Sequence, residues 1–181
     1  MIDGTEQATL TPAPLPQAGQ GRLMGAPVAQ AAEGGSPRVV IDFHFNVDHP
    51  LIHACRVVRK ALGNHRTVLV FSRDAQRLAR LDSALWTFSA LDFLPHAYAD
   101  SELADRTPVW LSMTALSDRD RDVLLLLDDE AVPDFGVWFG RFERVIEIVS
   151  NEEEDRARAR VRFKAYRDSG FAPCSHQIAS P

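Results

Sequence analysis

Six cationic side chains are concentrated in residues 156–167, near the end of the chain, with no anionic residue among them. They are Arg156, Arg158, Arg160, Arg162, Lys164 and Arg167. Arginine and lysine bind carboxylates and phosphates, and the planar guanidinium group of arginine holds a carboxylate through two parallel hydrogen bonds. The chain as a whole has a formal net charge of -5. A local positive surface on an acidic protein indicates an anionic partner.

One helix over residues 150–171 is expected to position these cations. Gly170 is expected to end it, because glycine readily adopts the left-handed backbone conformation that follows many helices. At the start, carboxylates lie where the helix dipole favours negative charge. The cap is expected from Ser150 or Asn151, with Glu153 or Glu154 completing a capping box.

One side of this helix combines an aromatic ring with cations, at about 100° of rotation per residue. That side consists of Arg156, Arg160, Phe163, Lys164 and Arg167. The pattern favours a binding surface, because a face that meets only water has little use for the ring of Phe163. The simpler alternative is a solvated arginine face with Phe163 packed inward.

Strands and helices alternate along the rest of the chain. Runs of β-branched and aromatic residues predict strands at 38–45, 67–71, 108–112, 123–127 and 144–149. Apolar spacing and capping residues predict helices at about 51–62, 74–86 and 135–142. This order predicts the α/β class, with a single open, mostly parallel sheet and helices on both faces. The link 113–122 is short for a parallel crossover, so the direction of the strand pair it joins stays open.

The expected domain is 38–174. Residues 1–37 are rich in proline and glycine and contain no aromatic residue, so we expect a disordered extension, with a tether or peptide ligand as the alternative. Residues 175–181 are expected to form a short flexible tail.

Cys55 and Cys174 lack the spacing of a metal site or a disulfide framework. Since no long apolar run or secretory signal is evident, we expect a cytoplasmic protein without membrane contact.

No catalytic residue, metal or cofactor is expected. The predicted sheet is like that of mononucleotide-binding folds, but neither glycine-rich phosphate-loop motif follows a strand. His49 and His53 have the spacing of a two-histidine metal site, without the glutamate that usually follows the first histidine. The acidic run 128–130 follows a strand, as magnesium ligands often do, although a solvated turn is the preferred interpretation. The expected chemistry is therefore recognition.

Two sequence blocks resemble one protein family. Residues 160–171, RVRFKAYRDSGF, are similar to the C-terminal signature of the chi subunit of bacterial DNA polymerase III. Upstream, residues 81–86, LDSALW, and 93–96, FLPH, resemble the other recognisable block of that family. The blocks occur in the family's order, and the resemblance spans residues 38–174.

The resemblance implies a non-catalytic accessory subunit that acts in DNA replication. Chi subunits link the clamp loader, through the psi subunit, to the single-stranded DNA-binding protein, whose acidic C-terminal tail ends in a phenylalanine with a free carboxylate. Contact with DNA is then mainly indirect.

A site for this tail is also implied, residue by residue. Arg160 would fork onto the terminal carboxylate, and Arg156 and Lys164 would attract the preceding acidic residues. Phe163 and Val149 would form the walls of an apolar slot. Phe163 stands where tyrosine is often found, and Arg156 where lysine can occur, so ring and charge are kept.

A surface that faces psi is expected around the second block, because aromatic anchors are typical of interfaces. It would consist of Trp86, Phe93, Leu94 and Pro95. A buried structural corner explains the same residues equally well, and His96 is expected to brace the core or a loop.

Two other classes of function stay open at this point. The basic helix would serve a protein that binds nucleic acid directly, with affinity that falls steeply as salt rises. A metal-dependent enzyme that processes phosphates would instead use Asp128, Asp129 or Asp42 to hold a cation.

Overall fold

The computed structural model describes residues 39–90, 93–116 and 121–178. They belong to one compact unit, Gly34–Pro181. The extension predicted at 1–37 therefore lies outside the described residues.

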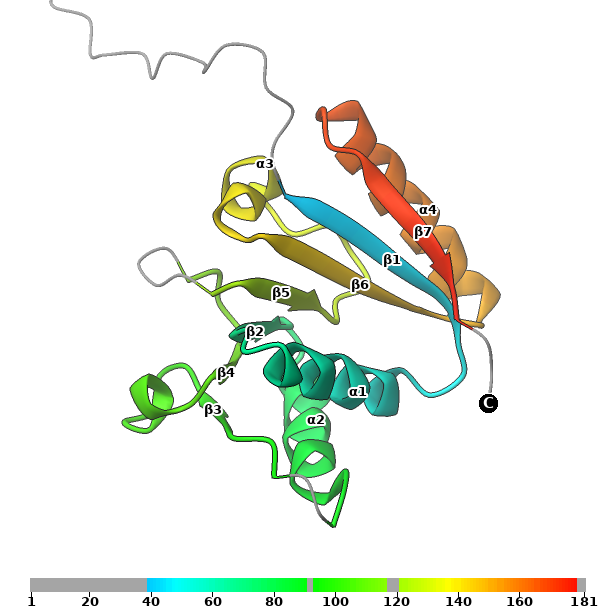
Figure 1. Cartoon of the computed structure of the whole chain (residues 1–181). Helices are drawn as coiled ribbons and strands as arrows, with labels where there is room; N and C mark the ends of the chain where they lie inside the picture. Colours follow the sequence, from blue (N-terminus) through cyan, green and yellow to red (C-terminus); the bar gives the residue numbers. More distant parts are fainter. Residues whose placement is uncertain (1–38, 91–92, 117–120, 179–181) are drawn as a thin grey trace, which may run out of the picture. The chain divides into compact units, whose positions relative to one another are not determined.

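A seven-stranded sheet forms the centre of the fold, in the order β3-β4-β2-β5-β6-β1-β7 (Figure 1). Each neighbouring pair of strands is parallel, which confirms the predicted α/β class with one open sheet. The strands are β1 (Val40–Val47), β2 (Val68–Phe71), β3 (His96–Tyr98), β4 (Val109–Ser112), β5 (Val123–Leu126), β6 (Arg144–Ser150) and β7 (Pro173–Gln177).

Helices cover both faces of the sheet, as predicted. The α-helices are α1 (Pro50–Gly63), α2 (Ala75–Thr87), α3 (Phe135–Trp138) and α4 (Glu153–Asp168), and the short 3-10 helices are η1 (Ala104–Arg106) and η2 (Phe139–Arg141). The apolar residues of α1 and α2 share one core cluster, and those of α3 and α4 share another on the opposite face.

Side-chain alternation along β6 assigns its residues to the two faces. Ile146 and Ile148 pack into the cluster of α1 and α2, whereas Val145 and Val149 pack into the cluster of α4. All four are buried, as expected for a parallel sheet with helices on both sides.

The strand pair whose direction stayed open is not a pair of neighbours. β2 lies between β4 and β5 and runs parallel to both. The link after β4 therefore crosses over β2, rather than joining two adjacent strands as a hairpin would.

Two strands, β3 and β7, are not predicted by the sequence pattern. β3 has only three residues, and β7 is a polar edge strand that pairs with β1 from Pro173 to Gln177. The prediction of a flexible tail from residue 175 is thus wrong for residues 175–177, because backbone hydrogen bonds to β1 order a segment that lacks an apolar pattern.

The C-terminal end of α4 confirms the predicted role of Gly170, which has a φ of 90°. Its N–H donates to the carbonyl of Arg167, and the N–H of Phe171 donates to the carbonyl of Tyr166, at 3.0 and 3.1 Å. This pair of hydrogen bonds is the Schellman motif.

The N-terminal end of α4 differs from the prediction. Glu152 is the N-cap residue, and its side chain makes no capping hydrogen bond. Asp155 instead accepts hydrogen bonds from the backbone N–H and the hydroxyl group of Ser150, at 2.7 and 2.8 Å. The predicted capping box with Glu153 or Glu154 is wrong, and these two carboxylates are left to pair with arginines.

Candidate binding surfaces

The exposed flank of α4 carries three of the predicted site residues together, because residues four apart lie above one another on a helix. Arg156 is half-buried, and Arg160 and Lys164 are exposed. In the described part of the chain, Lys164 forms no ion pair. These side chains form a cationic ridge along one side of the helix.

Glu153, in the first turn of α4, pairs with two members of this ridge. Its carboxylate lies 2.6 Å from a guanidinium nitrogen of Arg156 and 3.0 Å from one of Arg160. Hydrogen bonds from Arg160 and then Arg156 hold the pKa of Glu153 below its usual value. Sequence reasoning assigned Glu153 only to a possible cap and missed this bridge.

Phe163 lies at the edge of the core beneath the ridge. Its ring is half-buried, with its centroid 5.2 Å from that of Phe43, and the ring of Phe45 also stacks against Phe43, at a centroid distance of 5.9 Å. The ring packs inward, as the simpler alternative predicts, and one part of it stays accessible. A role of Phe163 in binding stays a prediction. Phe45 is a half-buried candidate that sequence reasoning missed, although the alternation Ile41, Phe43, Phe45 places it on the same face.

Val149 does not line an open slot. It belongs to the core cluster of α4 and is 0 % exposed. The prediction that Val149 forms a wall of a binding slot is therefore wrong, because a side chain without accessible surface has no direct contact with a ligand.

Arg162 points away from the ridge and into the core, where it is 2 % exposed. Its Nε donates to the buried carboxylate of Glu147 at 2.7 Å, and the Tyr166 hydroxyl donates to the same carboxylate at 2.6 Å. Burial raises the pKa of the Glu147 carboxyl, and the nearby Arg162 charge opposes that rise. Arg162 therefore anchors α4 to β6 and belongs to the structure rather than to the binding surface.

Arg158 is also held by carboxylates of the chain. It pairs with Glu154 at 2.8 Å and approaches Asp129 at 3.8 Å. Much of the positive charge predicted for the helix is therefore neutralised within the protein.

A second surface lies at the C-terminal end of α2. Trp86 and Phe93 are 58% and 65% exposed, and their ring centroids are 5.4 Å apart. Pro95 is half-buried, but Leu94 is only 3% exposed. The predicted psi-facing set is therefore corrected at Leu94, which packs into the core of α1 and α2.

His96 is buried and braces the loop that precedes β3, as predicted. Its Nδ1 lies 2.7 Å from the carbonyl oxygen of Leu94, and its ring centroid is 5.0 Å from that of Trp86. The aromatic pair is thereby positioned over the edge strand β3.

The acidic run after β5 is occupied by arginines. Asp128 accepts hydrogen bonds from the Ser72 hydroxyl at 2.8 Å and from Arg73 Nε at 2.7 Å. Asp129 accepts two hydrogen bonds from Arg77, which lower the pKa of its carboxyl. These partners occupy the carboxylates that a magnesium site would need, and the predicted solvated turn is wrong for Asp128, which is buried.

Of the two histidines considered as metal ligands, His53 contacts a histidine of β1. It lies 2.8 Å from the Nδ1 of His44, and His176 contacts Asp42 at 2.7 Å. Arg144 also pairs with Asp42, at 3.1 Å. Within the described residues, no group of three or more His, Cys, Asp or Glu side chains is placed to hold a metal ion.

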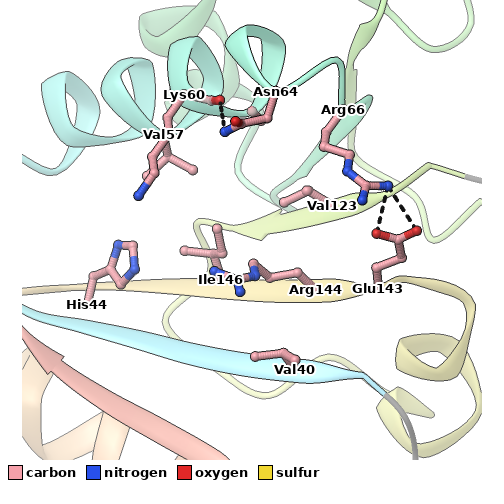
Figure 2. A pocket seen from close by; sticks show the side chains of 11 residues that line it. Val40, His44, Val57, Lys60, Asn64, Arg66, Val123, Glu143, Arg144 and Ile146 are labelled. Atoms are coloured by element: carbon pink, nitrogen blue, oxygen red, sulfur yellow. Dashed lines mark hydrogen bonds and ion pairs between the residues drawn. The ribbon is translucent and has the colours of Figure 1, made fainter.

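A groove of about 650 Å³ lies between α1 and the strands β1, β5 and β6 (Figure 2). Val57, Val123 and Ile146 contribute apolar surface to it. Two of its cationic side chains are already paired, Arg66 with Glu143 and Arg144 with Asp42. These pairs lower the net charge that the groove presents to a ligand.

Comparison with known proteins identifies the family of the chain. A family model described as DNA polymerase III chi subunit, HolC, matches residues 39–173. The chain belongs to the DNA polymerase III chi subunit family. It is therefore a replication accessory subunit of a polymerase complex.

Two chi subunits illustrate the extent of the similarity. The DNA polymerase III subunit chi of Pseudomonas aeruginosa is 33% identical over 125 residues, which cover 69% of this chain and 84% of that protein. The subunit chi of Escherichia coli strain K12 is 30% identical over 118 residues, which cover 65% of this chain and 78% of that protein.

Solved structures outside the chi family share the fold. Saccharomyces cerevisiae Dbp5 bound to RNA and ADP BeF3 has a TM-score of 0.56 at 10% identity, covering 78% of this chain and 42% of that chain. Dbp5 bound to Nup159, Gle1, IP6 and ADP has a TM-score of 0.54 at 11% identity, covering 81% and 44%. At these identities the likeness concerns the α/β fold alone.

Across the described ranges, no helix has the length and apolarity needed to cross a bilayer.

Proposed function

We propose that this chi-family chain is a non-catalytic adaptor that joins the clamp loader, through the psi subunit, to the acidic C-terminal tail of the single-stranded DNA-binding protein. One observation carries the proposal: two surfaces of suitable chemistry lie on well-separated parts of the sheet. α4 packs over β6 and the edge strand β7, whereas Trp86 contacts His96 in the opposite edge strand, β3. An adaptor needs such a separation, because both partners must bind at once.

The α4 ridge suits a peptide that ends in an aromatic residue with a free carboxylate. Arg160 would bind the terminal carboxylate, and Arg156 and Lys164 would bind or attract the acidic residues before it. The open edge of Phe163, with Phe45 as a second ring of the same row, would contact the peptide's aromatic side chain. The contact area is small, so we expect weak binding that fades with salt.

The Trp86 and Phe93 pair suits the psi subunit. Exposed large aromatic rings, held in place by a buried residue such as His96, are typical anchors of a protein interface. Leu94 would act only by supporting the two rings.

Direct nucleic-acid binding by α4 is less well supported. Arg156, Arg158 and Arg160 are paired with carboxylates on the same helix, and Arg162 is buried, so few cations remain for a phosphate backbone. An enzymatic role is also disfavoured, because Asp128, Asp129 and Asp42 already bind arginine or histidine side chains.

Calorimetric titration of the full chain tests the proposal. The probe is an acidic peptide ending in Asp-Ile-Pro-Phe, compared with the same peptide carrying a C-terminal amide. We expect binding that needs the free carboxylate, and a loss of roughly tenfold or more in Arg160→Ala, because a charged hydrogen bond contributes about 1.5 to 3 kcal/mol. Arg56→Ala, which removes an exposed arginine from α1, is the matched control and should bind normally.

Two results would contradict this site. Equal binding of acid and amide would remove the carboxylate from the mechanism, and unchanged affinity in Arg160→Ala would remove Arg160. If neither peptide binds while single-stranded DNA does, α4 is a nucleic-acid surface.

A further inference from the structure

Glu153 already accepts hydrogen bonds from the two guanidinium groups to which the peptide is proposed to bind, those of Arg156 and Arg160. Its Oε2 lies 2.6 Å from Nη2 of Arg156, and its Oε1 lies 3.0 Å from Nη1 of Arg160. A single carboxylate thus bridges two guanidinium groups that are one turn apart on α4. The free protein therefore holds a carboxylate of its own on both of the arginines to which the carboxylates of the ligand are proposed to bind.

The ion pairs that Glu153 forms with Arg156 and Arg160 are exposed, so a ligand can replace them. The Glu153 side chain is 67% exposed, and those of Arg156 and Arg160 are 35% and 63% exposed. Exposed ion pairs are weak, since water competes for both partners. After release, Glu153 would still lie in the first turn of the helix, where the helix dipole favours a negative charge.

We infer that Glu153 is an internal competitor, which the carboxylates of the bound peptide displace: the terminal carboxylate replaces it on Arg160, and the acidic residues before the terminus replace it on Arg156. This inference rests on the proposed function of the α4 ridge. It assigns Glu153 a part in specificity, because an uncharged peptide end has no means of replacing a carboxylate. A peptide with a terminal carboxylate and neighbouring acidic residues would engage the arginine pair and Lys164 together.

Glu154 provides the matched control for Glu153. It is the next residue on the same turn and has the same charge, but it pairs with Arg158 at 2.8 Å and makes no contact with Arg160. Glu154→Gln therefore removes one negative charge beside the ridge while leaving the Glu153 bridge intact. The difference between the two variants isolates the bridge from the general effect of charge.

The test is calorimetric titration of the full chain as wild type, Glu153→Gln and Glu154→Gln, with the acidic peptide and its amide. We expect Glu153→Gln to bind the free-acid peptide roughly three- to tenfold more tightly than wild type, because two exposed ion pairs no longer have to be broken. Glu154→Gln should differ from wild type by less than about twofold. In an Arg160→Ala background, most of the gain from Glu153→Gln should disappear.

The possible results distinguish failure of the Glu153 competition from failure of the proposed peptide site. Weaker binding by Glu153→Gln would show that Glu153 positions the arginines, and equal gains in both glutamine variants would show a general charge effect. Either result overturns the competition while wild type still binds through the free carboxylate. If no variant shows carboxylate-dependent binding, the proposed function fails and the competition fails with it.

Discussion

At the scale of single residues, Arg162 and Arg160 have opposite roles although they are two positions apart on α4. Arg162 is buried and paired with Glu147, whereas the Arg160 side chain is 63% exposed. Removing one member of a buried ion pair leaves the other charge without a partner, which usually costs about 3 to 5 kcal/mol. Arg162→Leu should therefore lower the free energy of unfolding by about that much in urea denaturation.

Two further variants make this prediction specific. Replacing both partners, as Glu147→Leu with Arg162→Leu, should recover much of the lost stability, since no buried charge then remains. Arg160→Ala, at the surface, should change the free energy of unfolding by less than about 0.5 kcal/mol. Equal losses in Arg162→Leu and Arg160→Ala would mean that the Glu147 pair does not anchor α4.

Helical spacing placed Arg156, Arg160 and Lys164 on one flank, but it did not reveal that Arg162 is buried. The residue that indicates the burial of Arg162 lies in another element. Glu147 occupies an inward position of β6, between Val145 and Val149. A carboxylate on a buried face needs a charged or hydrogen-bonding partner. This indication becomes usable only when β6 is known to lie beneath α4, which is information about the tertiary fold.

At the scale of elements, His44 in β1 connects the sheet to α1 and β7. It lies 2.8 Å from His53 of α1, contacts His176 of β7 edge to face, and has Asp42 and Lys60 nearby. Burial, followed by the charge of His53, lowers the pKa of His44 to about 4. The folded protein therefore resists protonation at a position where the unfolded chain has the ordinary value of about 6.5.

This difference predicts acid sensitivity between pH 6.5 and 4. In that range the unfolded state binds a proton at His44 and the folded state does not, so stability falls as the pH falls. Because the ring is partly open to solvent, we expect a contribution of only about 1 to 2 kcal/mol. His44→Gln should flatten the curve of unfolding free energy against pH in this window. An unchanged slope would show that His44 is protonated equally easily in both states.

The elements that could be predicted from the sequence are those in which the pattern of hydrophobic residues follows the burial of the side chains. β2 and β5 are buried along their whole length, and the amphipathic spacing of α1 and α2 matches their packing. β7 is mostly exposed and polar, so no hydrophobic period marks it, and its backbone pairing to β1 alone makes it a strand. Edge strands of this kind follow from the tertiary fold more than from local sequence.

At the scale of the whole molecule, the proposed adaptor predicts two independent surfaces. The Trp86 ring lies against His96 of β3, whereas α4 packs over β6 and β7, and the three strands β4, β2 and β5 separate β3 from β6 in the sheet. Mutations that share no partners usually act independently. Trp86→Ala should weaken binding of the purified psi subunit by roughly thirtyfold or more, as for an interface hot spot, and should leave peptide affinity unchanged.

The reciprocal measurement completes this prediction. Arg160→Ala should lose peptide affinity and keep psi affinity, and wild type saturated with psi should bind the acidic peptide as tightly as the free chain does. Because an adaptor works by holding both partners at the same time, this equality is its main physical requirement. If psi and the peptide exclude each other in calorimetry, the two surfaces overlap or are coupled, and the chain would exchange its partners rather than join them.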